Sequence, residues 1–416
     1  MYHNLTEKKI VVVGTGYVGF PAALFLARAG AKVIGVDINP EYVDAINSGK
    51  IPVKEEALQE LMDDPDVRAR LTARLTPCPA DVFIIAVPTP LLEPKKIANL
   101  RAVITATHSI VPHLRRGNLV ILESTVPPLT CKKVMTPILE KSGLKVGKDI
   151  YLAHCPERIF PGNVLHEIVN NDRVIGAADP VSRRLASELY GTFVKGELFE
   201  TDDVTAELCK LAENAYRDVN IAFANEIAAV AEGLGIDPHQ VIAISNRHPR
   251  VNIHEPGIGV GGHCIPIDPW FIREADSNNT SMILAARTVN DRMPERIAGK
   301  IREVVKDIIN PRIVALGVAY KPNAEDMRES PAVRVVDLLK KDGYNVKQYD
   351  PLVKGFGYSS LKEVCSGAHC VVMLVKHDVF CEELNFHREE LESVMATPII
   401  LRFDKEYSQA LEINIQ

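Results

Sequence analysis

The sequence predicts an α/β protein in which two doubly wound domains are joined by a central helical domain with one long helix. Short apolar runs alternate with helical stretches from residue 9 to about residue 200, and the same alternation starts again near residue 310. Between the two, residues 204–232 contain no Gly or Pro. Because domains average roughly 100–200 residues, we expect this chain of 416 residues to form domains at 1–200, 201–305 and 306–416.

Strands of a parallel sheet are expected in the first domain. Short continuous apolar runs, without polar alternation, are typical of strands that are buried on both faces. Helical stretches such as Pro21–Ala29 lie between the runs, and this order is typical of a doubly wound sheet. The expected strands lie at 9–13, 32–36, 82–87, 118–122 and 150–153.

One long helix is expected over 204–232, which is rich in Ala, Glu, Leu and Ile. Asp202 or Asp203 can cap its N-terminus, and Gly233 and Gly235 follow its end. Such a helix is on the order of 43 Å long at 1.5 Å per residue. Its length suggests a domain or dimer contact.

The third domain repeats the strand and helix order of the first. We expect strands at 312–318, 344–349 and 370–375, with a helix at 331–342. This recurrence predicts a second, smaller α/β domain.

Composition excludes several classes of protein. The net charge is −6 and dense Lys/Arg blocks are absent, which argues against a nucleic-acid surface. No apolar run approaches the roughly 20 residues of a membrane helix. The eight cysteines are scattered and form no CxxC pair, which is typical of reduced thiols. We therefore expect a cytoplasmic protein that binds neither nucleic acid nor membrane.

A GxGxxG motif, formed by Gly14, Gly16 and Gly19, follows the first expected strand and opens a helix. In a Rossmann-like domain, the three glycines allow a tight turn, close approach of a pyrophosphate, and helix–strand packing. Asp37 ends the second expected strand, 18 residues past Gly19. A carboxylate there accepts hydrogen bonds from ribose hydroxyls and repels a 2′-phosphate, so the sequence favours NAD over NADP. The alternative is a glycine turn without a ligand.

Two loops that follow expected strands are candidates for the ligand crevice. Thr89 lies in the loop after 82–87, and Thr125 lies in the loop after 118–122. Loops at the carboxyl ends of parallel strands line such a crevice. Plain turn chemistry explains the Pro, Ser and Thr residues of these loops equally well.

The strongest candidate for a reaction centre is Cys264. Four glycines stand in the six positions 257–262, so the backbone can approach a ligand closely. Cys264 follows them, with Asp268 four residues further on, and a thiolate is a good nucleophile for carbonyl carbons. The alternative is a structural cysteine in a tight turn. We expect His263 to be a structural hydrogen-bonding residue and expect no metal site.

Polar residues on the long helix are candidates for oxyanion stabilisation. Lys210, Asn214 and Arg217 share one helix face because they stand at i, i+4 and i+7. A Lys and an amide can donate hydrogen bonds to a developing oxyanion. A solvated polar face is the ordinary alternative for such a triple.

Phosphate binding needs cations, and two groups of cations are candidates. Arg247, His248 and Arg250 stand just before the glycine stretch, and Lys321 and Arg328 follow the strand expected at 312–318. Ordinary surface charge is the alternative for each.

Taken together, these motifs resemble the UDP-glucose/GDP-mannose dehydrogenase family along nearly the whole chain. The form Gly261–Trp270 (GGHCIPIDPW) is similar to the branch that acts on UDP-N-acetylhexosamines. The stretches 217–226 and 246–253 are similar to members that act on UDP-N-acetyl-D-mannosamine, and the gluco epimer UDP-N-acetylglucosamine is the nearest alternative. The motifs that carry the resemblance are GxGYVG at 14–19, Pro88–Pro90, Glu123–Thr125, Cys155–Arg158, Lys210 with Asn214, GGHC at 261–264 and Lys321–Pro331.

The resemblance implies an NAD-dependent four-electron oxidation of the C6 alcohol to a carboxylate, which supplies glycan or surface polysaccharide precursors. Cys264 would form a thiohemiacetal and then a thioester. Lys210 would act as acid/base or oxyanion group, assisted by Asn214 and Asp268. Glu157 would help to position water.

The family also implies binding residues. Those for NAD are Gly14, Gly16, Tyr17, Val18, Gly19, Asp37, Thr89, Thr125 and Arg328. Those for the UDP-sugar are Arg158, Ile159, Lys210, Asn214, Arg217, Gly261, Tyr320 and Lys321. His248 and Arg250 would reach the UDP-sugar from the partner subunit of a homo-oligomer, either a dimer or a dimer of dimers.

One departure from the family pattern and two other functional classes remain. Residues 399–405 read IILRFDK, where members often read Asp-Thr-Arg, so Arg402 receives no role. A single-step β-hydroxyacid dehydrogenase shares the first domain and the long helix but needs no cysteine. A non-catalytic NAD-sensing module would bind the cofactor without turnover and would leave the GGHC motif unexplained.

Overall fold

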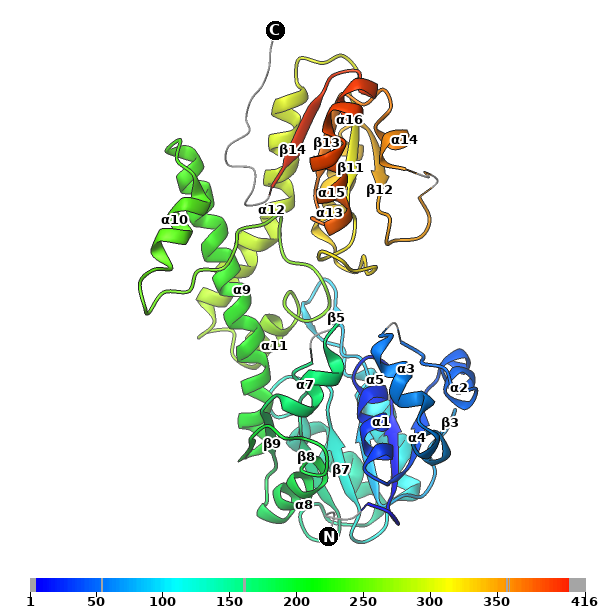
Figure 1. Cartoon of the computed structure of the whole chain (residues 1–416). Coiled ribbons are helices and arrows are strands. Elements are labelled where there is room, and N and C mark those ends of the chain that lie inside the picture. The colour runs from blue at the N-terminus through cyan, green and yellow to red at the C-terminus, as the bar shows by residue number, and fades with distance from the viewer. Residues whose placement is uncertain (1–4, 54, 160–161, 357, 359, 404–416) are drawn as a thin grey trace. The chain divides into compact units, whose positions relative to one another are not determined.

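The structure is a computed structural model that describes residues 5–403, except 54, 160–161, 357 and 359. The chain divides into two compact units (Figure 1). The first comprises Met1–Glu213 and Trp270–Asp276, and the second comprises Asn214–Pro269 and Ser277–Gln416. The domain boundaries expected at 200 and 305 stay a prediction.

The first unit is built on one large sheet with the strand order β10-β9-β8-β7-β4-β1-β2-β3. From β3 to β8 the neighbours are parallel, in the order of a Rossmann fold. The expected strands are confirmed, with β4 and β7 somewhat shorter than predicted. They are β1 (Lys9–Val13), β2 (Lys32–Val36), β4 (Val82–Ile85), β7 (Leu119–Leu122) and β8 (Tyr151–His154).

Further strands of this sheet were not assigned from the sequence. β3 (Leu71–Arg74) lies at one edge, and β9 (Arg173–Gly176) and β10 (Leu198–Thr201) lie at the other. β9 pairs antiparallel with β8 and parallel with β10. An antiparallel edge is common on an otherwise parallel sheet. A small antiparallel pair, β5 (Leu91–Leu92) and β6 (Ile97–Ala98), follows β4.

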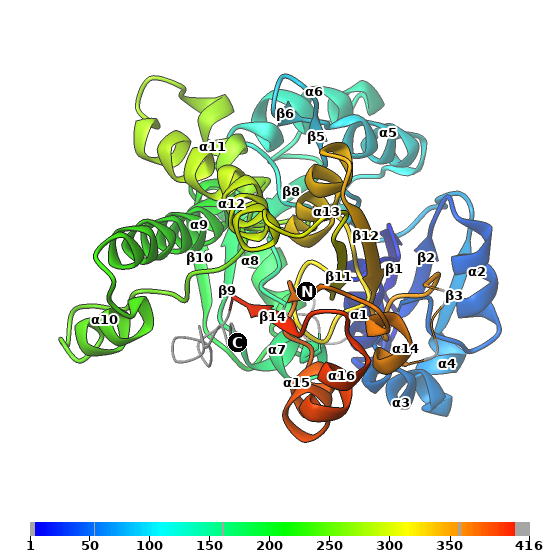
Figure 2. The same cartoon turned by 90° about the horizontal axis from the view of Figure 1, so that it is seen from above.

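Both faces of the first sheet are buried. Ile10 and Val12 of β1 pack into one hydrophobic cluster, and Val11 and Val13 pack into another. Because successive side chains of a strand point to opposite faces, the apolar run serves two cores. One helical layer consists of α1, α3, α4, α7 and α8, and the opposite layer contains α5 and α6 (Figure 2).

The helices of the first unit lie between the strands, as predicted. The helix expected at 21–29 is α1 (Gly19–Arg28), which begins at the third glycine of the motif. The others are α2 (Pro40–Asn47), α3 (Ala57–Asp63), α4 (Pro65–Arg70), α5 (Arg101–Ile110), α6 (Thr136–Leu139), α7 (Val164–Asn170) and α8 (Pro180–Tyr190), with short turns at Val111–His113, Cys131–Met135 and Glu140–Ser142.

The predicted long helix is α9 (Asp203–Gly233). Asp202 caps it, since its carboxylate accepts the backbone N–H of Thr205 at 2.8 Å. Its first turns belong to the first unit, and the rest, from Asn214, belongs to the second. The helices that follow are α10 (Pro238–Ser245), α11 (Asp268–Ala275) and α12 (Ser281–Val305).

The second unit contains a smaller parallel sheet in the order β12-β11-β13-β14. α12 and α13 pack on one face, and α14, α15 and α16 pack on the other (Figure 2). The predicted α/β recurrence is therefore confirmed. The elements are β11 (Arg312–Leu316), α13 (Pro331–Lys341), β12 (Asn345–Tyr349), α14 (Leu361–Cys365), β13 (Cys370–Met373), α15 (Asp378–Phe386), α16 (Arg388–Val394) and β14 (Ile399–Arg402).

Among the helices of the described residues, none combines the length and the apolar character that crossing a membrane requires.

Candidate active site

The glycine motif forms the turn between β1 and α1. A Cβ on Gly14 would lie 2.3 Å from the carbonyl oxygen of Ala86, and a Cβ on Gly19 would lie 2.0 Å from that of Gly14. Gly14 also has a φ of +92°. These two positions therefore require glycine for the fold itself.

Gly16 differs from both, because a Cβ built there meets no atom within 4 Å. The space beside Gly16 is therefore open to a ligand. The N-terminus of α1 has no side-chain cap and no acidic residue in its first turn. Unpaired N–H groups and the helix dipole make such an end a binding site for a pyrophosphate, so these residues fit NAD.

Asp37 stands at the end of β2 as predicted, and it also holds the glycine turn. One carboxylate oxygen accepts the N–H and the hydroxyl of Thr15, at 2.9 and 3.1 Å. The other accepts the N–H of Asn39 at 2.9 Å. The carboxylate is half-buried, so it remains available to a ribose as a further acceptor.

The two predicted crevice loops are joined to each other. The Thr89 hydroxyl donates to the carbonyl of Thr125 at 2.7 Å. The hydroxyl of Ser124 accepts the N–H of Val87 at 2.9 Å. The loops after β4 and β7 therefore form one wall of the first unit.

A buried network supports this wall, and we did not predict it from the sequence. Glu123, the residue before Ser124, accepts a hydrogen bond from the Tyr190 hydroxyl at 2.6 Å and one from Arg173 at 3.2 Å. Arg173 also stacks on the Tyr190 ring, 4.3 Å from its centroid. Burial raises the pKa of Glu123 against the lowering effect of the Arg173 charge. The partners come from β9 and α8, so only an alignment of relatives could have signalled them.

Lys210 and Glu157, both predicted as catalytic, lie together in the first unit. The Lys210 ammonium is 3.9 Å from the Glu157 carboxylate, and both side chains are nearly buried. Glu157 follows β8, and its other oxygen accepts the N–H of Ile159. An ammonium from α9 and a carboxylate from the loop after β8 therefore lie side by side.

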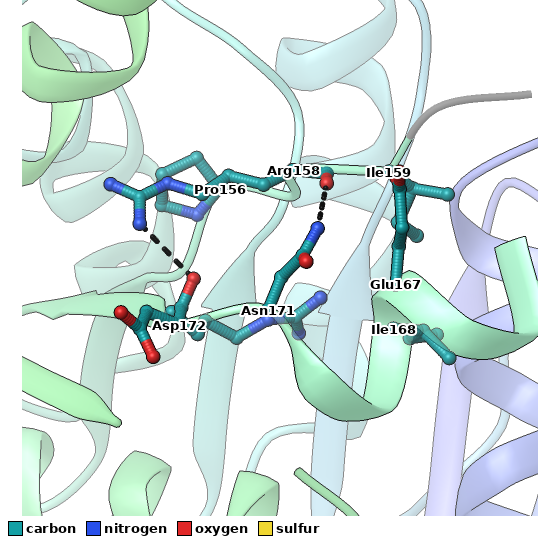
Figure 3. A pocket seen from close by; sticks show the side chains of 8 residues that line it. Pro156, Arg158, Ile159, Glu167, Ile168, Asn171 and Asp172 are labelled. Atoms are coloured by element: carbon teal, nitrogen blue, oxygen red, sulfur yellow. Dashed lines mark hydrogen bonds between the residues drawn. The ribbon is translucent and has the colours of Figure 1, made fainter. Parts of the chain in front are cut away.

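Arg158 and Ile159, predicted to bind substrate, line a small cavity in the first unit (Figure 3). Arg158 donates to the carbonyl of Asp172 at 3.1 Å and forms an ion pair with Glu213, while Asn171 donates to the carbonyl of Arg158. The cavity holds about 10 Å³, which is about the space of one water. It is too small for a sugar.

Glu207, one turn before Lys210 on α9, is a further residue that the sequence did not reveal. Its carboxylate accepts the backbone N–H groups of Leu129 and Cys131, at 2.5 and 2.8 Å. Burial raises its pKa to about 7. Glu207 thus ties the helix of Lys210 to the loop that carries Thr125.

In the second unit, two glycines fix the chain just before Cys264. A Cβ on Gly261 would lie 3.0 Å from the Tyr320 Cβ, and one on Gly262 would lie 2.8 Å from the ring of Tyr320. Gly262 has a φ of +87°, and its N–H donates to the carbonyl of Arg328 at 3.2 Å. The glycine-rich loop is therefore packed tightly against the loop that follows β11.

The chain after Cys264 is fixed by the start of α11. The carbonyl of Cys264 accepts the N–H groups of Ile267 and Asp268, at 3.0 and 2.9 Å. The Asp268 carboxylate is buried and accepts the side-chain amide of Asn214 at 2.6 Å. Two predicted catalytic residues are thus in contact, and they hold the turn that carries the thiol.

The thiol of Cys264 is half-buried, and His263 Nδ1 lies 3.3 Å from its Sγ. Most of the cysteines are buried, like small hydrophobic residues. Cys78, Cys131, Cys155, Cys365 and Cys370 are buried, whereas Cys209, Cys264 and Cys381 are half-buried.

The loop after β11 brings other predicted residues together. The Lys321 ammonium lies 5.9 Å from the centroid of the Tyr320 ring. Arg328 is exposed and binds the Asp326 carboxylate through Nε and Nη2, at 2.9 and 2.6 Å. Asp350 clamps the start of this loop, as its carboxylate accepts the N–H of Val318 at 2.8 Å.

The remaining predicted residues lie further along the chain. Arg217 is exposed on α9. Partial burial and, to a smaller extent, the charge of Arg217 lower the pKa of His254. His248 and Arg250 are exposed after α10, and the N–H of Arg250 donates to the His248 ring at 3.3 Å. Arg402 ends β14. Across the described residues, no group of three or more His, Cys, Asp or Glu side chains is arranged to hold a metal ion.

The parallel sheet, the glycine turn and the acidic residue after β2 define a dinucleotide-dependent oxidoreductase. Three domain models of one family match the chain in order. They are the NAD binding domain at residues 8–194, the central domain at 204–292 and the UDP binding domain at 314–405. The chain therefore belongs to the UDP-glucose/GDP-mannose dehydrogenase family, and it catalyses NAD-dependent oxidation of a nucleotide sugar.

Individual relatives narrow the comparison. The chain is 46% identical over 395 residues to a UDP-N-acetyl-D-mannosamine dehydrogenase of Methanocaldococcus jannaschii, covering 94% of this chain and 90% of that one. It is 41% identical to an NDP-N-acetyl-D-galactosaminuronic acid dehydrogenase of Ralstonia nicotianae, covering 91% and 92%. The solved UDP-D-ManNAc dehydrogenase of Pyrococcus horikoshii aligns with a TM-score of 0.91 and 38% identity, covering 96% of each chain.

Proposed function

We propose that the chain oxidises the C6 primary alcohol of UDP-N-acetyl-D-mannosamine to the carboxylate, with Cys264 as the covalent catalyst. The observation that carries the proposal is the Cys264 loop. Its backbone is fixed on both sides while its thiol stays half-buried and accessible. A cysteine kept only for packing would be buried like Cys365 or Cys370.

The covalent step explains how one site completes two oxidations. The Cys264 sulfur adds to the sugar aldehyde to form a thiohemiacetal, and the second oxidation converts it to a thioester that water releases as the uronate. NAD, when held at the glycine turn and Asp37, would supply the hydride acceptor for each oxidation. The aldehyde stays attached to the protein between the two steps, so it is not lost to solvent.

Lys210 and Asn214 supply hydrogen-bond donors for the oxyanion that forms in each tetrahedral state. Asp268 holds the Asn214 amide at 2.6 Å, which fixes the direction in which its remaining N–H points. The Glu157 carboxylate, 3.9 Å from Lys210, stabilises the ammonium and helps to position the hydrolytic water. Thr125 assists from the neighbouring loop.

Cofactor and substrate contacts follow the same proposal. Gly14, Gly16, Tyr17, Val18, Gly19, Asp37, Thr89, Thr125 and Arg328 contact NAD. Arg158, Ile159, Arg217, Gly261, Tyr320 and Lys321 hold the UDP-sugar together with Lys210 and Asn214. The product serves as a precursor of surface polysaccharide or another glycan, and we place the reaction in the cytoplasm, where the thiol stays reduced.

A second copy of the chain completes the site in this proposal. Tyr216, Phe223 and Val230 stand seven residues apart on α9, so they share one face, and they are 59%, 47% and 60% exposed. Such an apolar stripe on a long helix favours pairing with the same helix of another subunit. His248 and Arg250 would then reach the sugar nucleotide of the partner subunit.

The test combines substrate choice with product stoichiometry. A panel of UDP-sugars that includes the N-acetylated manno, gluco and galacto forms is scored by NADH production. We expect the manno form to give the highest kcat/KM and two NADH for each sugar consumed. One NADH for each sugar would indicate a single-step dehydrogenase, and binding without turnover would indicate a sensing module. The galacto form is included because of the Ralstonia relative.

A cysteine variant tests the covalent step. Cys264→Ser should lose formation of the uronate, while Cys381→Ser, which alters another half-buried thiol, should retain it. If Cys264→Ser forms the uronate at the wild-type rate, the covalent mechanism is wrong. A preference for NADP over NAD would likewise overturn the role given to Asp37.

A further inference from the structure

We infer that His263 is the base that takes the proton of the Cys264 thiol, a role that deepens the proposed function and rests on it. The sequence suggested only a structural hydrogen bond for His263. The structure instead directs Nδ1 of its ring toward the Cys264 sulfur at 3.3 Å, within hydrogen-bonding distance for sulfur. Nδ1 as acceptor requires the neutral tautomer with its hydrogen on Nε2.

The backbone around the pair limits how far these two side chains can move apart. Gly262 precedes His263 and is fixed by its packing on Tyr320 and by its hydrogen bond to Arg328. Cys264 is fixed by the two N–H groups that its carbonyl accepts. The side chains of adjacent residues usually point in different directions. Here the backbone is fixed on both sides of the pair, and this fixed backbone keeps the two side chains in contact.

The imidazole also lies close enough to a carboxylate for a charge interaction. The positive form of His263 interacts with Asp326, in the loop after β11. Burial raises the pKa of Asp326, but the hydrogen bonds and charge of Arg328 and the charge of His263 outweigh it, so its pKa is lowered. Cys264 and Asp326 are thus titratable groups that act on the ring, Arg328 pairs with Asp326, and Tyr320 packs against the preceding glycine.

This arrangement favours a thiolate–imidazolium pair over a neutral thiol and imidazole. An adjacent imidazolium lowers the pKa of a cysteine from its ordinary value of about 8.5. Asp326 stabilises the imidazolium, while its own pairing with Arg328 keeps it ionised and limits how strongly it holds His263. The exposed ring also exchanges protons with solvent between turnovers.

The proton and electron pairs balance in each step. The thiol proton moves to Nδ1, and its bonding pair stays on sulfur and forms the S–C bond to the aldehyde carbon. The carbonyl pair moves to oxygen and returns when hydride leaves the carbon. In hydrolysis a water hydroxyl joins the acyl carbon and its proton goes to solvent. The sulfur departs with its bonding pair and takes the proton back from Nδ1.

The test measures the thiol without substrate. The rate at which iodoacetamide alkylates Cys264 is followed from pH 5 to 10, with the labelled peptide identified by mass spectrometry because Cys209 and Cys381 are also partly exposed. We expect the alkylation rate of the wild type to rise with pH around a midpoint below about pH 8.5. In His263→Gln the midpoint of the profile should move up by about one pH unit, and alkylation at pH 7 should be about tenfold slower. His387→Gln, at another exposed histidine of the second unit, should leave the profile unchanged.

An unchanged alkylation profile in His263→Gln overturns the inference, even if kcat falls, because the loss would then come from substrate contact or packing. Since alkylation needs neither NAD nor sugar, its result is independent of the substrate panel. A wild-type enzyme that releases one NADH for each sugar would refute the proposed function while leaving the thiol measurement valid.

Discussion

The same added methyl group should reduce stability at one glycine of the motif and NAD affinity at another. In Gly19→Ala the methyl would lie 2.0 Å from the Gly14 carbonyl oxygen and 3.1 Å from the Ala86 Cβ. The first contact is with backbone, so β1 and α1 would have to move apart. Overpacking costs about 1–3 kcal/mol, and we expect the upper end, about 3 kcal/mol.

Gly16→Ala adds the methyl to open space, since no atom lies within 4 Å of its Cβ. The free energy of unfolding should change by less than about 0.5 kcal/mol. NAD affinity should instead fall at least about tenfold, or about 1.4 kcal/mol, because the methyl would occupy the side from which a pyrophosphate approaches the backbone.

Thermal unfolding and NAD titration of both variants separate the two effects. A loss of 3 kcal/mol should lower the Tm of the first unit by roughly 6–12 °C, whereas Gly16→Ala should melt like the wild type. If Gly16→Ala binds NAD with wild-type affinity, the cofactor does not use the open side of the glycine turn. Equal destabilisation of the two variants would refute the steric reasoning.

Three further predictions concern pH, assembly and a buried ion pair. Burial raises the pKa of Glu207 from 4.5 to about 7, so between these pH values the folded chain retains a proton that the unfolded chain releases. The free energy of unfolding should therefore fall as pH rises from 4.5 to 7. In urea unfolding, Glu207→Gln should reduce this dependence on pH. Phe223→Glu places charge on the exposed stripe of α9 and should reduce the mass measured by light scattering to the monomer value of 45.9 kDa. Asp218→Asn removes the buried carboxylate that lies 2.5 Å from Arg287 and leaves this buried guanidinium paired with Asp291 alone, so it should cost about 3 kcal/mol, the lower end of the range for a broken buried ion pair, in denaturant unfolding. Lys306→Met, which breaks an exposed ion pair, should leave unfolding unchanged as the control.

The local sequence predicted the central strands because both faces of the sheet are buried, so most residues of these strands are apolar. β1 packs Ile10 and Val12 against one core and Val11 against the other, so a continuous apolar run is required. The ends were less certain. The strand expected to reach Val318 stops at Leu316, because the N–H of Val318 turns to the Asp350 carboxylate.

The edge strands of the first sheet were not predicted, for the opposite reason. β3 and β10 each have a neighbour on one side, and their sequences, LTAR and LFET, mix polar and apolar residues. Such a strand is held by backbone pairing with an already formed sheet. That pairing depends on residues far along the chain, which local periodicity does not record.

The sequence by itself determined the fold class, the glycine turn, the acid after β2 and the candidacy of Cys264, because each depends on backbone geometry or on nearby residues. Tertiary structure alone decided which side chains meet. Glu123 finds Tyr190 from 67 residues away, and Glu207 reaches the backbone of Cys131 from 76 residues away. Hydrogen bonds and charge interactions act over a few ångströms in space, so their partners become known only when the chain has folded.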